Sequence, residues 1–270
     1  MAFDWSGLRE PAPGTLVAAR EVAHCAVQWA TKAARANLPA APDDSHSALV
    51  WDAGLGALLG APMARRVRVG VHLAALELFV AHDGKAELHP LQGSTPRAVD
   101  DWLDLKLATL GLKGVSSVRL PYEVPPRALE NVPGLAALAR WFAAAAEVLE
   151  EVRARHAAMR PGPVVCWPHH FDIALVVPLG HGAGGPARSI GIGVSPGDGY
   201  YAQPYAYVSP YPAPRNPQPP ALPPGGHWHT KDFFGAVATA EALLAQLDPR
   251  AALLAVIDAA FDASKKWLDG

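Results

Sequence analysis

The fold class is decided by residues 189–209, which read SIGIGVSPGDGYYAQPYAYVS. Ser189 to Val194 has the apolar run that is typical of a strand, and residues 195–199 contain the proline, glycines and aspartate of a turn. Tyr200 to Ser209 then returns as a second strand. Because strands joined by a short turn pair antiparallel, the stretch predicts an antiparallel sheet. Together with the amphipathic helices elsewhere, it predicts an α+β protein.

The elements predicted on either side of this stretch follow a similar order in each half of the chain. Apolar periodicity and capping residues predict helices over residues 15–37, 94–111, 134–156, 232–247 and 248–268. Alternating or apolar runs and a His82-Asp83-Gly84-Lys85 turn predict strands over residues 48–51, 66–82, 86–91, 118–124 and 164–177. We interpret this order as an internal duplication of two similar helix–antiparallel-sheet–helix halves, residues 1–125 and 126–270, packed as one unit.

Composition excludes several classes of protein. The chain has 270 residues, 50% of them hydrophobic and 18% charged, with a formal net charge of −2, so we expect a globular protein. Without a basic run, neither nucleic acid nor a membrane is an expected partner. No signal peptide or membrane span is visible, which predicts a cytoplasmic location. The two cysteines, Cys25 and Cys166, are expected to be buried free thiols. A nearly neutral, apolar-rich chain is compatible with a homodimer.

The candidate site is formed by two short segments, Trp167-Pro168-His169-His170-Phe171-Asp172 and His227-Trp228-His229. Polar side chains in such apolar settings are costly to bury without partners. If residues 164–177 form one strand, His170 and Asp172 share a face of it. A carboxylate beside an imidazole fixes its tautomer and keeps it basic. We therefore predict His170 as a catalytic base and Asp172 as its orienting carboxylate.

The same residues have the spacing of a metal site. A His-x-Asp pair followed by a distant histidine resembles the two-histidine, one-carboxylate arrangement, which predicts His170, Asp172, His227 and His229 as ligands of a divalent ion such as zinc, iron or manganese. The alternative is a hydrogen-bonded His170–Asp172 pair within a core polar network. The protein would then be a non-catalytic structural or protein-interaction module.

Further residues are candidates for binding a small polar molecule. Tyr205 and Tyr207 alternate along a strand and, with Tyr201, could wall a pocket, since tyrosine has an apolar body and a polar tip. The other candidates for binding are His169, Asp198 and Trp228, although Asp198 is first of all a turn former. The proline-rich residues 209–226 are either a spacer or a lid over the site. The leading hypothesis is an enzyme or binder for a small polar molecule, because nucleotide-binding and esterase motifs are absent.

Three motifs carry a resemblance to a known family. Trp-Pro-x-His-Phe-Asp at residues 167–172, Ser-Pro-Gly-Asp at 195–198 and Pro-Tyr-x-Tyr-Val at 204–208 resemble a bacterial family of uncharacterised proteins, a domain of unknown function. The resemblance covers most of the chain and implies no established activity. It implies that a site common to the family rests on His170 and Asp172, whereas His169, His227 and His229 would belong to a subgroup.

Overall fold

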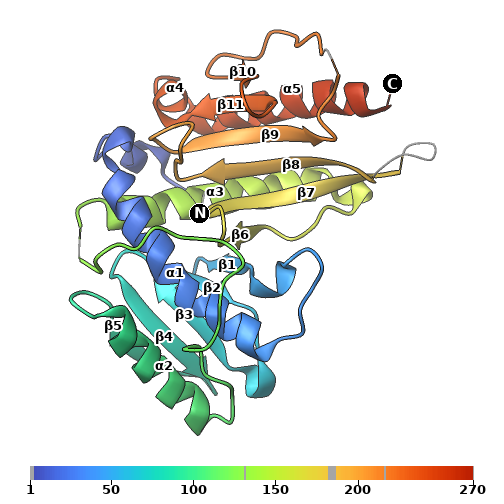
Figure 1. Ribbon diagram of the computed structural model, residues 1–270. Coiled ribbons are helices and arrows are strands. Elements are labelled where there is room, and N and C mark those ends of the chain that lie inside the picture. Colours follow the sequence, from blue (N-terminus) through green and yellow to red (C-terminus); the bar gives the residue numbers. More distant parts are fainter. Residues whose placement is uncertain (1–2, 131, 182–186, 216, 270) are drawn as a thin grey trace. The chain divides into compact units, whose positions relative to one another are not determined.

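The computed structural model describes residues 3–130, 132–181, 187–215 and 217–269 (Figure 1). In these residues the chain forms five α-helices and eleven strands, and the strand pairs within each sheet are antiparallel. The predicted α+β class is therefore confirmed. None of the helices in the described ranges is long and apolar enough to cross a membrane.

The chain divides into two compact units, and each of them is built from segments that are separated in the sequence. Unit 1 contains residues 1–15, 144–164 and 172–270, and unit 2 contains residues 16–143 and 165–171. The chain passes from one unit to the other four times: after Thr15, after Ala143 inside a helix, after Val164 and after Phe171. The similarity of the sequence halves 1–125 and 126–270 stays a prediction.

Unit 2 has a sheet in the order β6-β1-β2-β3-β4-β5. Its strands are β1 (Leu49–Asp52), β2 (Ala57–Gly60), β3 (Arg68–His72), β4 (Glu77–His82), β5 (Lys85–Pro90) and β6 (Val165–Trp167). Helix α1 (Val17–Asn37) packs on β2 and β3, and buries a stripe that includes Val22, Ala26 and Trp29. The predicted hairpin between β4 and β5 is confirmed, with positive φ at Asp83 and Gly84 as such turns require.

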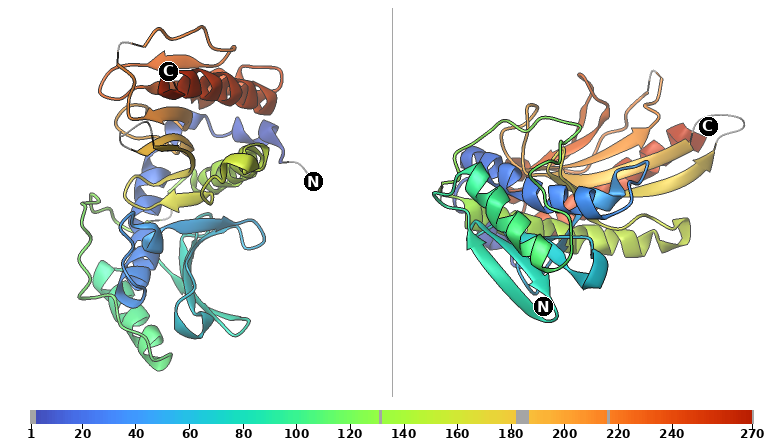
Figure 2. Two further views of the ribbon diagram at one scale, coloured as in Figure 1. Left: turned by 90° about the vertical axis from the view of Figure 1, so that its right-hand side faces the viewer. Right: turned by 60° about the horizontal axis from the view of Figure 1, so that its bottom comes forward.

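Helix α2 (Pro96–Thr109) begins where its capping residues predict. Thr95 accepts a hydrogen bond from the backbone N–H of Ala98, and Pro96 occupies the first turn. Figure 2 shows this helix beside the β4–β5 hairpin, where Trp102 stacks on His89. Helix α3 (Leu135–Arg155) confirms the predicted helix over residues 134–156 and passes from unit 2 into unit 1.

Unit 1 has a sheet in the order β7-β8-β9-β11-β10. Its strands are β7 (Asp172–His181), β8 (Ala187–Ser195), β9 (Tyr205–Tyr211), β10 (His227–His229) and β11 (Gly235–Thr239). Helix α5 (Pro249–Asp269) lies along β8, β9 and β11 (Figure 1). The Asp248 side chain caps α5 by accepting from Ala251 N–H, as expected. Helix α4 (Ala240–Leu244) is a short helix that precedes α5.

Several predicted elements differ from the structure. The strand predicted over residues 66–82 is wrong as a single strand, because residues 73–76 form a turn between β3 and β4. The strand predicted over residues 200–209 begins only at Tyr205, the first residue of β9.

The strand predicted over residues 164–177 is wrong, because a turn separates β6 from β7. The N–H groups of His170 and Phe171 both bond the Trp167 carbonyl, and Phe171 has a φ of 59°. The strand predicted over 118–124 is also wrong, since that segment is a loop. The helix predicted over 232–247 is wrong in its first part, where β11 pairs with β9 before α4 begins.

Candidate functional site

The sheet of unit 1 has one apolar and one polar face. Register across the strands puts Ile192, Val208, Ala236 and Trp228 on the same face. This is the face toward α5, because the Trp228 ring contacts Trp267 of that helix at 5.1 Å. Side chains alternate along strands, so their neighbours lie on the opposite face. We call this opposite surface the polar face. It also contains apolar residues such as Ala174 and Val237. The residues of it that matter here are Asp172, Gly193, Ser195, Tyr205, Tyr207, His227 and His229, together with Tyr201 and Asp198 beside them.

Tyr207 and Asp172 are joined across an intervening strand. The Tyr207 hydroxyl donates a hydrogen bond to Oδ2 of Asp172, which is 6% exposed. Tyr207 is on β9 and Asp172 on β7, with Gly193 of β8 between them. A Cβ atom at position 193 would lie 2.6 Å from Cζ and the hydroxyl oxygen of Tyr207. Glycine at 193 therefore allows the tyrosine ring to cross β8 and reach the carboxylate.

Asp198 shapes the turn and also holds a tyrosine. Its Oδ1 accepts from the backbone N–H groups of Tyr200 and Tyr201, at 2.8 and 3.2 Å. Its Oδ2 accepts from the Tyr205 hydroxyl at 2.5 Å. The predicted turn-forming role is therefore confirmed. The same carboxylate also fixes the loop that carries Tyr201, whose ring lies 4.9 Å from that of Tyr205.

Tyr201 connects the two histidines of β10. Its hydroxyl oxygen lies 2.9 Å from Nε2 of His227 and 2.8 Å from Nδ1 of His229. Nε2 of His229 lies 2.5 Å from the Lys231 carbonyl oxygen, which can only accept, so this nitrogen carries the proton. In the tautomer with the proton on Nε2 alone, Nδ1 of His229 accepts from the Tyr201 hydroxyl, and that hydroxyl can accept from Nε2–H of His227. These contacts form a series of hydrogen bonds that runs from His227 through Tyr201 and His229 to the Lys231 carbonyl.

The environment of His227 and Tyr201 favours the uncharged form of each. Burial, and then the neighbouring His229, lower the pKa of His227 below its ordinary value. Burial, and then the Asp198 carboxylate, raise the pKa of the Tyr201 phenol. Both groups are therefore neutral near pH 7. His227 is exposed and His229 half-buried, so this end of the polar face is open to solvent.

The buried tyrosines make stability fall at alkaline pH. Burial and the Asp172 carboxylate raise the pKa of Tyr207, and burial and the Asp198 hydrogen bond raise that of Tyr205. The folded protein keeps these phenol protons, whereas the unfolded chain releases them above pH about 10. The free energy of unfolding should fall above that pH, by up to about 1.4 kcal/mol per pH unit for each such tyrosine.

Urea unfolding at a series of pH values measures this slope. Tyr207→Phe should be less stable at neutral pH but should show a shallower alkaline decline than the wild type. An equal slope in the two proteins would contradict the assignment to Tyr207.

The Trp167–Phe171 turn forms a second histidine cluster, in unit 2. The Pro168 carbonyl accepts from Nε2 of His24 at 2.8 Å and from the Gln28 amide at 2.9 Å. The Gln28 amide oxygen in turn accepts from the Tyr122 hydroxyl at 2.9 Å. His169 contacts the rings of Tyr122 and His170, at 5.8 and 4.2 Å between ring centres. Burial first, and then neighbouring charges, lower the pKa values of His24 and His169.

The structure distributes the predicted site residues unevenly. Asp172, Asp198, Tyr201, Tyr205, Tyr207, His227 and His229 belong to the polar face of unit 1. Trp228 points to the opposite face, where it stacks on Phe234 and donates to the Pro220 carbonyl. His169 and His170 belong to unit 2, so the His170–Asp172 pair and the four-residue metal set stay predictions. In the residues that the structure describes, no group of three or more His, Cys, Asp and Glu could hold a metal ion.

Sequence reasoning missed several residues that build these clusters. Gly193 lies inside a predicted strand and no role was assigned to it, and the Lys231 carbonyl is a backbone group that no motif predicts. His24 and Gln28 lie four residues apart on α1, a spacing that puts both side chains on one face of the helix, and that spacing could have indicated them.

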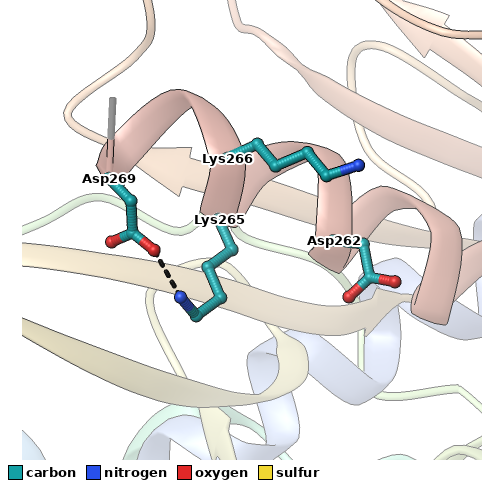
Figure 3. Close-up of a pocket in the computed structure, with 4 residues that line it drawn as sticks. All are labelled: Asp262, Lys265, Lys266 and Asp269. Carbon is teal, nitrogen blue, oxygen red and sulfur yellow. Dashed lines mark hydrogen bonds and ion pairs between the residues drawn. The ribbon is translucent and has the colours of Figure 1, made fainter.

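A groove of about 570 Å³ on the outer side of α5 has a different character (Figure 3). Asp262, Lys265, Lys266 and Asp269 line it, and Lys265 pairs with Asp269. Its charges are two acidic and two basic and lie on the helix surface, so the groove is not a strong candidate for a specific site.

Comparisons with known proteins found no match for this chain. No model of a known protein family, no curated protein and no solved structure matches the chain. The resemblance to a bacterial family of uncharacterised proteins therefore stays a prediction.

Proposed function

We propose that unit 1 binds a small polar molecule at the polar face beside β10, as an enzyme or as a binding protein. One observation carries the proposal: the Tyr201 hydroxyl meets both His227 and His229 within 2.9 Å at a solvent-accessible edge of the face. Polar groups fixed at the border of an apolar sheet give a ligand defined hydrogen-bond partners.

His227 is the proposed acid–base group of this site. The lowered pKa leaves its ring neutral at pH 7, with one nitrogen lone pair. Within the described part of the chain, Nδ1 of His227 has no hydrogen-bond partner, since the recorded bond is made by Nε2. Nδ1 is thus placed to accept a proton or a hydrogen bond from a hydroxyl or amine of the bound molecule.

Asp172 and Asp198 have a supporting role in this proposal. Each carboxylate already accepts from a tyrosine, Tyr207 or Tyr205, so it positions the face instead of contacting the ligand. The Asp172–Tyr207 bond favours the second hypothesis for that residue, a polar network that fixes the sheet. A base role for His170 with Asp172 remains a separate proposal, which requires the two side chains to lie within hydrogen-bond reach.

A ligand-observed NMR screen of sugars, amino acids, hydroxy acids and nucleosides tests the proposal. The screen compares wild type, His227→Ala and Tyr201→Phe, with and without added divalent metal. We expect at least one class of molecule to bind the wild type and to bind both variants at least about tenfold more weakly, the loss that 1.4 kcal/mol represents. His82→Ala, on β4 of unit 2, is the matched control and should retain binding. Hits that survive in both site variants would place the binding elsewhere.

A further inference from the structure

We propose that His227, His229 and Tyr201 bind a divalent transition-metal ion, and that copper(II) fits the three donors best. The inference concerns the site of the proposed function and names the group through which the small polar molecule would be held. The statement that the metal would hold the small polar molecule rests on the proposed function. Metal binding itself does not, because it can be measured without that molecule.

The Tyr201 oxygen lies at hydrogen-bond distance from both imidazole nitrogens, and a metal ion could bridge donor atoms at these two separations. Tyr201 Oη lies 2.9 Å from Nε2 of His227 and 2.8 Å from Nδ1 of His229. Two ligands at about 2.05 Å from one ion, at an angle of about 90°, are about 2.9 Å apart, whereas a tetrahedral angle separates them by about 3.3 Å. The observed separations therefore match the adjacent corners of a square-planar or tetragonal site.

His229 also makes the hydrogen bond that metal-binding histidines usually make through the ring nitrogen that does not bind the ion. The ring nitrogen that faces away from Tyr201, Nε2, donates to the Lys231 carbonyl oxygen at 2.5 Å. Such a bond fixes the tautomer and orients the other nitrogen toward the ion. Phe233 stacks on the His229 ring at 4.0 Å between centres, which restricts its rotation. The ring is thus held before any ion arrives.

The strand geometry brings the second imidazole to the same place. His227 and His229 are two residues apart on β10, so both side chains project from one face of the sheet. Among the strands described in unit 1, β10 has β11 as its only partner, and its other side is an edge. His227 is exposed at this edge and His229 is half-buried, so an ion can reach both from solvent.

The donor set selects the ion by its chemistry. Two imidazole nitrogens and one phenol oxygen in a tetragonal arrangement suit copper(II) or nickel(II), and copper(II) binds such donors most strongly among the divalent ions of this row. On binding, the phenol O–H bond breaks, its proton leaves to solvent, and the oxygen lone pair forms the bond to the metal. To bind through Nε2, His227 must lose the Nε2 proton to solvent and take up one on Nδ1, so in the metal-bound state Nδ1 donates a hydrogen bond and no longer acts as the proton acceptor. The remaining coordination positions are open to water or a small polar molecule.

Copper titration of the metal-free full chain tests the inference. Affinity is measured by competition with a chromophoric chelator, and the visible spectrum is recorded in parallel. We expect one copper(II) per chain and a phenolate-to-copper charge-transfer band. Tyr201→Phe should abolish the band. His227→Ala and His229→Ala should each weaken binding at least about tenfold, since losing even an outer partner of a ligand costs about 10–100-fold.

The controls make each outcome decisive. His82→Ala should bind copper like the wild type, and circular dichroism should show every variant folded, as expected for changes at a solvent-accessible edge. Unchanged affinity in both histidine variants, or a wild-type complex without the band, would overturn the three-donor site. Hits in the NMR screen without copper binding would overturn this inference alone. Copper binding without any hit would retain it and remove the proposed function.

Discussion

Phe171→Ala should lower the free energy of unfolding by about 3–5 kcal/mol, the usual loss when a buried phenylalanine is truncated. Phe171 is 1% exposed and fills the centre of the turn in unit 2. Its ring stacks on His24 at 5.1 Å and an interplanar angle of 6°, and contacts Phe142 at 5.2 Å. Removing the ring leaves a cavity beneath the histidine cluster. Equilibrium urea unfolding measures the change, with exposed Leu105→Ala as a control that should stay within about 0.5 kcal/mol.

The backbone at Phe171 provides a second test. Its φ of 59° lies in the left-handed region, where glycine is unstrained and alanine is not. Phe171→Gly should therefore be at least as stable as Phe171→Ala, the reverse of the order usual in a strand. A Phe171→Gly variant about 1 kcal/mol less stable than Phe171→Ala would contradict the positive φ.

Gly193→Ala should cost about 3 kcal/mol, although it adds a single methyl group. The new Cβ would meet the Tyr207 ring at 2.6 Å and the Ala174 Cβ at 2.8 Å. Overpacking of this kind costs about 1–3 kcal/mol, and displacing Tyr207 from the buried Asp172 carboxylate adds a comparable loss. The measurement is again urea unfolding.

Gly191→Ala is the matched control for this substitution. Gly191 lies on the same strand and face, but the nearest atom to its Cβ would be the Ser209 carbonyl oxygen at 3.8 Å. It should not lower stability and should raise it by up to about 1 kcal/mol, because alanine is favoured over glycine within a strand. A double-mutant cycle locates the cause: with Tyr207→Ala already present, Gly193→Ala should lose the part of its cost that comes from the tyrosine ring, and only the contact with the Ala174 Cβ remains. Additive effects would contradict the crossing of the ring over Gly193.

Unit 2 contains the same arrangement of a glycine under an aromatic ring, with a phenylalanine in place of the tyrosine. Gly70 of β3 pairs with Phe79 of β4, and a Cβ atom at position 70 would lie 2.5 Å from the phenylalanine Cζ. In both units a glycine between two β-branched residues is covered by the aromatic ring of its cross-strand partner. The two sequences have the same pattern, Val69-Gly70-Val71 and Ile192-Gly193-Val194. The aromatic covers give that pattern a structural counterpart.

The sequence by itself determined the features that depend on local chemistry. Periodicity and caps located α1, α2, α3 and α5, since Thr95, Pro96 and Asp248 act within one helical turn of their own positions. The short turn at Asp83-Gly84 determined a hairpin. Alternation also predicted that Tyr205 and Tyr207 share a face and that His227 and His229 do. In each case, the residues that specify the feature lie within a few positions of the residues that adopt it.

Tertiary structure decided what depends on residues far apart in the chain. The apolar run around His169 predicted a continuous strand, but burying the Phe171 ring against His24 and Phe142 accompanies a positive φ that no local preference of phenylalanine favours. The partners of Tyr201 and Tyr207 lie 26 to 35 residues away, and only strand register brings them together. Hydrogen bonds of this kind are set by the order in which strands pair, which local sequence does not specify.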